Sequence, residues 1–102
     1  MTSPQLSTLD LSSRRLTSVP AKTWRKSSPR ILNLFRNELK RLPAAIGELK
    51  ELRALIVANN QLRALPEEIG SLQNLRMLDA GHNLLADLPL SFARLTALTD
   101  YL

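Results

Sequence analysis

Catalysis would need a nucleophile, a base and an orienting group at suitable spacing, and the first candidate to weigh is His82, which stands three residues after Asp79. His82 is the only histidine, however, and no serine stands at a recognisable nucleophile spacing. Gly47, Gly70 and Gly81 are too far apart for a phosphate-binding loop. The chain has no cysteine, which excludes thiolate metal ligands and disulfides. Since no nucleophile, base and orienting group come together, we predict a chain that is not an enzyme and has no cofactor or metal.

Leucine dominates the composition and points to the elements that position these residues. Of the 102 residues 23 are Leu, which indicates one leucine-filled unit used repeatedly in a single domain, residues 1–102. The longest apolar run, 54–58, has five residues, whereas a membrane span needs about 20. The first residues lack the basic and apolar segments of an export signal. Together with the absence of cysteine, this predicts a cytoplasmic location.

The leucines recur with a period of 23 residues and without insertion or deletion. The same step relates several columns of residues: Leu9, Leu32, Leu55 and Leu78; Leu16, Leu39, Leu62 and Leu85; Val19, Leu42, Leu65 and Leu88; Pro20, Pro43, Pro66 and Pro89. Within each unit an L-x-L core alternates with period two, which predicts a short strand with one buried face. A Pro followed by acids at Glu67 and Glu68 predicts a short helical return, and Gly70 is predicted to terminate it.

An asparagine also recurs in three of the units, at Asn37, Asn60 and Asn83. A buried amide must be hydrogen-bonded, so we predict a structural ladder in which these side chains bond backbone groups where the chain bends out of the strand. Arg14 holds this column in the first unit, which predicts a less regular bend there.

The unit L-x-x-L-x-L/V-x-x-N-x-L, followed by x-x-L-P-x-x-I-G, resembles the leucine-rich repeat family, and specifically its intracellular 23-residue class. The match is densest from Leu42 to Pro89. The resemblance implies an α/β fold: a right-handed solenoid, or horseshoe arc, with a parallel concave sheet and short helical or 3-10 returns. It would contain about four repeats and the start of a fifth. It further implies scaffolding or recognition inside a cell, as part of a signalling or effector protein.

Both ends depart from this pattern. Between Lys22 and Arg30 the residue types of the repeat fail, so this return is predicted to be loose and exposed, with Trp24 covering the gap left by Thr23. No capping unit follows the last repeat, so apolar residues are predicted to lie open there: Leu95, Leu98, Tyr101 and Leu102. We therefore expect either the N-terminal piece of a longer array or self-association through this end.

The residues that face outward from the strands are the candidate partner-binding site on the concave face. Ile31, Phe35, Ile56 and Met77 are expected to cluster, with polar groups around them. The full set comprises Asp10, Ile31, Asn33, Phe35, Arg36, Ile56, Asn59, Met77, Asp79 and His82. An equally weighted alternative is that Ile31 and Ile56 only pack on each other as ordinary strand neighbours.

Positive charge is concentrated in residues 1–50, with ten Lys or Arg against three Asp or Glu, whereas residues 51–102 have four against six. An arginine column at Arg30, Arg53 and Arg76 could bind acidic groups, although long side chains lying along the apolar surface are favoured. The basic segment 22–30 could approach nucleic acid or an anionic membrane, although a solvated loop is favoured.

We predict a protein–protein interaction module or scaffold that binds another protein, of unknown identity, on its concave face. The alternative is a binder of nucleic acid or anionic lipid through the basic N-terminal half, and a third possibility is a cap that stabilises adjoining repeats. The dependence of affinity on salt separates the first two hypotheses. Binding through phosphate contacts weakens steeply with ionic strength, whereas binding through an apolar protein interface weakens modestly.

Overall fold

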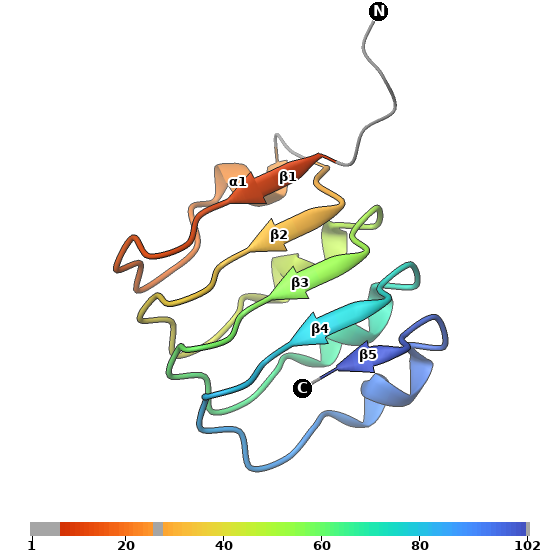
Figure 1. Cartoon of the computed structure of the whole chain (residues 1–102). Helices are drawn as coiled ribbons and strands as arrows, with labels where there is room; N and C mark the ends of the chain where they lie inside the picture. Colours follow the sequence, from red (N-terminus) through yellow and green to blue (C-terminus); the bar gives the residue numbers. More distant parts are fainter. Residues whose placement is uncertain (1–6, 26–27, 102) are drawn as a thin grey trace, which may run out of the picture.

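The computed structural model describes residues 7–25 and 28–101. Its five short strands form one parallel sheet in sequence order (Figure 1): β1 Thr8–Asp10, β2 Ile31–Asn33, β3 Ala54–Ile56, β4 Met77–Asp79 and β5 Asp100–Tyr101. The pairing register keeps the 23-residue step, so that Leu9, Leu32, Leu55, Leu78 and Tyr101 lie side by side. The predicted parallel strands are confirmed. We call each strand with the chain that follows it a coil.

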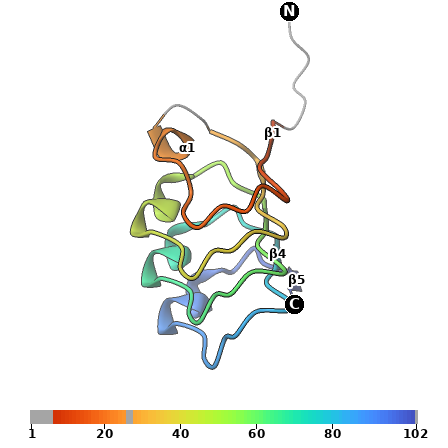
Figure 2. The same ribbon diagram turned by 90° about the vertical axis from the view of Figure 1, so that its left-hand side faces the viewer.

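The chain returns from each strand to the next through a short helix. The four returns contain α1 Lys22–Arg25 and the 3-10 helices η1 Ala44–Glu48, η2 Glu67–Ser71 and η3 Leu90–Arg94. They stack along the side opposite the strands (Figure 2). Pro43, Pro66 and Pro89 stand directly before the 3-10 helices in an extended conformation. Proline suits this position because its fixed φ is compatible with entry into a helix and it lacks an N–H that would otherwise need a partner.

The core lies between the sheet and the returns. The middle residue of each of β2, β3 and β4 is a buried leucine, and its flanking residues are half-buried. Leu49 and Leu72 of the returns belong to the same hydrophobic cluster. Each coil is too thin to enclose a core by itself, so its leucines are buried by the coils above and below.

The predicted role of Gly70 as a helix terminator is wrong. Gly70 lies inside η2, and its φ is not positive. A Cβ at this position would meet the Cβ of Ser91 in the next return at 2.5 Å, and a Cβ at Gly47 would meet the carbonyl oxygen of Glu68 at 3.0 Å. Glycine is required because successive returns pack closely, and its conformational freedom is not used.

The first return is better packed than predicted where the structure describes it. The exposed fraction of Thr23 is only 2%, and Pro29 is also buried, so the prediction of an exposed segment is wrong at both residues. Trp24 is half-buried and packs against the core, but Thr23 is itself buried and leaves no exposed gap of the kind that Trp24 was predicted to cover. Lys26 and Ser27 lie outside the described residues.

Candidate functional site

The predicted partner-binding residues of β2, β3 and β4 share the solvent side of the sheet, because they alternate with the buried leucines. The register places Ile31 and Met77 in one row, on either side of Ala54. Ile56 lies in the next row, between Asn33 and Asp79. Three apolar residues therefore lie on three adjacent strands whose axes are about 4.8 Å apart.

Phe35 follows β2 and is the most exposed apolar residue on this surface, with an exposed fraction of 37%. By the 23-residue step its counterparts in the neighbouring coils are Ser12, Ala58 and Gly81, which are all small. The ring of Phe35 is therefore flanked by small side chains on both sides. Its backbone is fixed, since its N–H donates to Asn33 Oδ1 at 3.0 Å and its carbonyl accepts from Ser13 N–H at 2.9 Å.

The acidic and amide residues expected around this apolar patch also accept hydrogen bonds from the backbone. Asp10 Oδ1 accepts from the N–H of Ser12 at 2.9 Å and from its hydroxyl at 2.6 Å. Asn33 Oδ1 accepts from Phe35 N–H, and Asp79 Oδ1 accepts from Gly81 N–H at 3.1 Å. In the first, second and fourth coils one side-chain oxygen thus accepts a backbone N–H at the strand exit, whereas the third coil has Ile56 at this position. The hydrogen bonds from Ser12 lower the pKa of Asp10, and Arg14 adds to this electrostatically.

A row of residues whose backbone has a left-handed conformation forms the next edge of the surface. Ser13, Arg36, Asn59 and His82 have φ between 54° and 59° and are exposed. Only glycine adopts this conformation without steric cost, and Asn and His tolerate it better than most other residues. His82 is therefore a bend residue. The first coil has a second left-handed residue, Arg15 with φ 57°, in agreement with the less regular bend predicted there.

The recurrent asparagines bridge consecutive coils. The side-chain amide of Asn60 donates to the carbonyls of Val57 in its own coil and of Leu34 in the preceding one, both at 3.0 Å. Its Oδ1 accepts from the N–H of Leu39, also in the preceding coil, at 3.0 Å. Asn37 and Asn83 make the equivalent bonds one coil earlier and one coil later. Each of these three amides, of which Asn37 and Asn60 are buried and Asn83 is half-buried, is thus satisfied by backbone groups of two coils.

The C-terminal side of the fourth coil exposes a different set of apolar residues from the predicted one. Leu95 belongs to the core cluster and has an exposed fraction of only 6%, so its predicted exposure is wrong. Leu98 is half-buried, and Leu102 lies outside the described residues. Tyr101 is exposed and packs edge-to-face on Phe92, with ring centres 5.9 Å apart.

Three exposed leucines were missed on this side: Leu84, Leu88 and Leu90. The exposed fraction of Leu90 reaches 92%. A comparison between coils could have found two of them, because Leu84 and Leu90 replace Gln61 and Glu67 of the preceding coil.

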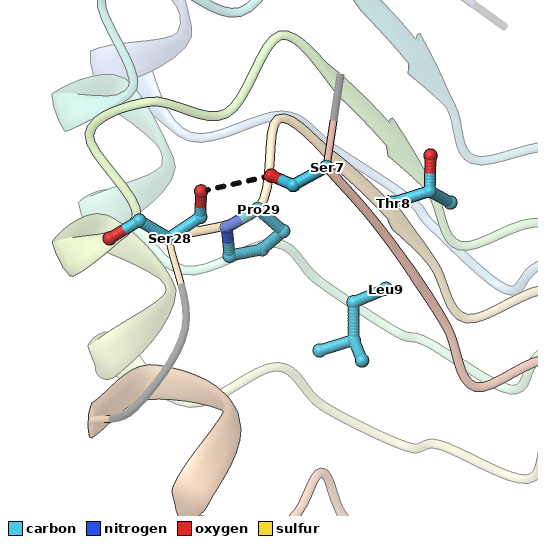
Figure 3. A pocket seen from close by; sticks show the side chains of 5 residues that line it. All are labelled: Ser7, Thr8, Leu9, Ser28 and Pro29. Atoms are coloured by element: carbon cyan, nitrogen blue, oxygen red, sulfur yellow. Dashed lines mark hydrogen bonds between the residues drawn. The ribbon is translucent and has the colours of Figure 1, made fainter. Parts of the chain in front are cut away.

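Two clefts were also missed. One, of about 250 Å³, lies beside β1 and is bridged by a hydrogen bond from the Ser7 hydroxyl to the carbonyl of Ser28 (Figure 3). The other, of about 310 Å³, includes Trp24 and Arg41 in its lining. Among the residues that the structure describes, no three metal-ligating side chains gather where they could hold an ion. Within 7–25 and 28–101, no helix has the length and apolar character needed to cross a membrane.

The architecture agrees with comparisons to known proteins. The family model described as leucine rich repeat matches residues 4–62. The solved leucine-rich repeat protein LIC12759 of Leptospira interrogans is similar, with 38% identity, a TM-score of 0.88 and coverage of 92% of this chain. The leucine-rich repeat domain of the type III effector XCV3220 (XopL) is similar over 97% of this chain, with 29% identity and a TM-score of 0.81.

This chain spans only 24% of the first of these solved chains and 36% of the second. None of the curated proteins compared with it matches. The continuous match of the family model, together with the register of the strands, shows that the chain belongs to the leucine-rich repeat family.

Proposed function

We propose that this chain is a non-catalytic protein-interaction module that binds a partner protein on its concave face, centred on Phe35. The observation that carries this proposal is an aromatic ring and three half-buried apolar residues on the solvent side of one sheet. Aromatic residues and Met are enriched in protein interfaces. The chain's lack of cysteine is consistent with work in a reducing compartment, and we propose a cytoplasmic scaffold or signalling role.

Rigidity supports the same proposal. The strand exits are fixed by backbone bonds between coils and by the side-chain oxygens of Asp10, Asn33 and Asp79. A surface held in this way loses little conformational entropy when a partner docks.

The distribution of positive charge disfavours the alternative of nucleic acid or lipid binding. Arg14 and Arg15 lie at the first bend, Lys22 and Arg25 lie on α1, and Arg30 directly precedes β2. These positions belong to three different sides of the coil, whereas a binder of phosphates needs its cations on one face.

The test is a pull-down that compares the unmodified chain with a Phe35→Asp, Ile56→Asp double variant. We expect the variant to lose the partner because two charges replace the apolar centre. The control is Ala64→Asp with Ala86→Asp, which adds the same charge at exposed positions away from the sheet. Retention of every partner by a folded double variant of the concave face contradicts the proposal.

A salt titration separates the alternative from the main proposal. Labelled RNA and anionic vesicles should bind weakly, and any such binding should fall steeply between about 50 and 200 mM salt. Binding to the captured protein should change only modestly. The reverse pattern would favour the basic half as the site.

We further propose that the apolar residues on the C-terminal side of the fourth coil form a contact with a second copy of the chain: Leu84, Leu88, Leu90, Leu98 and Tyr101. The first four of these residues belong to the fourth coil, and Tyr101 belongs to β5, which pairs on one side only among the described strands. Exposed apolar residues and an unpaired strand edge both favour association. Light scattering should show concentration-dependent dimers that Leu90→Asp abolishes. A stable monomer at high concentration contradicts this proposal.

The domain boundaries also remain a proposal. As the alternative to self-association through the C-terminal side, we propose that residues 1–102 are the N-terminal stretch of a longer array whose next coil covers that side, because the similar solved chains are several times longer. Further 23-residue units downstream in the parent gene would support it, and a stop codon directly after Leu102 would contradict it.

A further inference from the structure

One column of residues sets the distance between successive returns. Positions 24, 47, 70 and 93 are related by the 23-residue step and hold Trp, Gly, Gly and Ala. At Gly47 and Gly70 the next return approaches so closely that a Cβ would meet it at 3.0 Å and 2.5 Å. Contacts this short leave no room for a side chain, and least of all for an indole.

Trp24 therefore prevents the first two returns from approaching each other as the later ones do. Between these returns the structure has a cleft of about 310 Å³, and Trp24 is part of its lining. We attribute the cleft to this replacement of glycine by tryptophan. Its volume lies at the lower end of the range for ligand sites, which suits one or two side chains.

The lining combines two kinds of chemistry. Val19, Ala21, Trp24 and Pro43 supply an apolar wall. Thr17, Ser18 and Arg41 are the polar residues of the lining, and their side chains carry two hydroxyls and a guanidinium group. A site of this composition fits an apolar group that carries a carboxylate nearby, because the guanidinium forms charge-assisted hydrogen bonds to such anions.

The surrounding charge selects the same kind of occupant. Lys22 and Arg25 are the charged residues of α1, which has no acid, and they add to the charge of Arg41 in the lining. Their combined positive potential favours acidic segments over basic ones.

We propose that this cleft is a second binding site, separate from the concave face, for an acidic peptide segment of a partner protein. An aliphatic side chain of the peptide packs on Trp24, Val19 and Pro43. A neighbouring carboxylate of the peptide accepts hydrogen bonds from Arg41 and from the hydroxyls of Thr17 and Ser18.

Trp24 is the only tryptophan, so its fluorescence reports occupancy of the cleft directly. The probe is the acetylated, amidated peptide EELEE, and EESEE and KKLKK are its matched controls. EELEE should change the emission in a saturable way, EESEE should bind at least tenfold more weakly, and KKLKK should not bind. No saturable change with EELEE up to millimolar concentration, or equal binding of EELEE and EESEE, overturns the proposal.

A variant pair tests the anion contact. Arg41→Gln should weaken EELEE binding at least tenfold, because it removes a charged hydrogen-bond donor from the cleft. Arg63→Gln makes the same charge change at an exposed site of the next coil and should stay within twofold of the unmodified chain. Equal weakening by both variants would reduce the effect to general charge attraction and overturn the proposal.

A third variant tests the role of the indole. Trp24→Gly restores the residue of the later coils, and it should abolish EELEE binding measured by calorimetry while circular dichroism shows an intact fold. Undiminished binding by this folded variant overturns the proposal. If hexanoate binds the unmodified chain as tightly as EELEE does, the site takes small amphiphilic acids and the peptide proposal is wrong.

Discussion

The middle of the solenoid and its C-terminal side differ in burial even at a column where both have the same residue. Leu42 and Leu65 of the second and third coils are buried, whereas Leu88, their counterpart in the fourth, has an exposed fraction of 48%. The residue type and the proline that follows it are the same in all three coils. Burial in this fold is therefore a property of the neighbouring coil, and a leucine contributes to stability in proportion to the cover it receives.

Truncation of a leucine should show the largest difference between the two regions. Leu55→Ala removes a fully buried side chain and should lower the free energy of unfolding by about 2–5 kcal/mol. Leu88→Ala should cost less than about 1 kcal/mol, because much of that side chain is already in water. Urea unfolding of both variants measures the loss in the free energy of unfolding. Equal losses for Leu55→Ala and Leu88→Ala would contradict the difference between the two regions.

Loss of a bridging asparagine should come next. In Asn60→Ala the N–H of Leu39 loses its hydrogen-bond acceptor in a buried place, which costs about 1–3 kcal/mol. The carbonyls of Leu34 and Val57 each keep a bond from a neighbouring asparagine. Asn74→Ala, which removes one exposed bond to Lys50, is the matched control and should cost less than about 0.5 kcal/mol. Similar thermal shifts for the two variants would mean that the ladder adds little.

A methyl group added between the returns tests their close packing. Gly70→Ala places a Cβ against Ser91 and should destabilise by about 1–3 kcal/mol. Gly81→Ala meets only Asp79 Oδ1 at 3.4 Å, an ordinary contact, and should be nearly neutral. Chemical denaturation measures the free energy of unfolding of both variants. If Gly70→Ala leaves it unchanged, the close packing of the returns is contradicted, and with it the steric explanation of the cleft at Trp24.

Relief of a left-handed conformation should raise stability. Arg36 has φ 59°, so Arg36→Gly should stabilise by about 0.5–1 kcal/mol after the greater freedom of glycine in the unfolded chain is subtracted. Asn59→Gly should change stability less, since Asn tolerates this conformation. Scanning calorimetry can order the two, and destabilisation by Arg36→Gly would contradict the expectation.

The smallest expected effect is a dependence on pH at the first coil. The folded pKa of Asp10 lies below its unfolded value, so its ionised form stabilises the fold above the unfolded pKa. This contribution is lost as the pH falls through the lower folded pKa. Asp10→Asn keeps an acceptor for Ser12 and does not titrate. The measurement is the thermal midpoint of the unmodified chain and of Asp10→Asn from pH 2 to 6. The difference between the two midpoints should stay constant in the upper part of this range and should change with pH below about pH 4.

The strands, their register and the proline-led returns were predictable because each depends on a column that repeats every 23 residues. Features that depend on what lies against a column were not. Gly70 looks like a terminator in the sequence, but its size matters because of Ser91 in the next return. The burial of Leu95 and the exposure of Leu88 likewise depend on how far a neighbouring coil covers each side chain.

The candidate site was predictable only in part for a related reason. Period-two alternation placed Ile31, Ile56 and Met77 on the solvent side of the strands. The bonds of Asp10 and Asp79 to the backbone depend on local turn geometry, which spacing alone does not specify.

The asparagine bridges also give the chain a direction of assembly. The Oδ1 atoms of Asn37, Asn60 and Asn83 each accept from a backbone N–H about 21 residues earlier in the sequence. A bend therefore stays incomplete until the following asparagine has been synthesised. As the chain emerges from the ribosome, native structure must trail the newest residue by about one repeat.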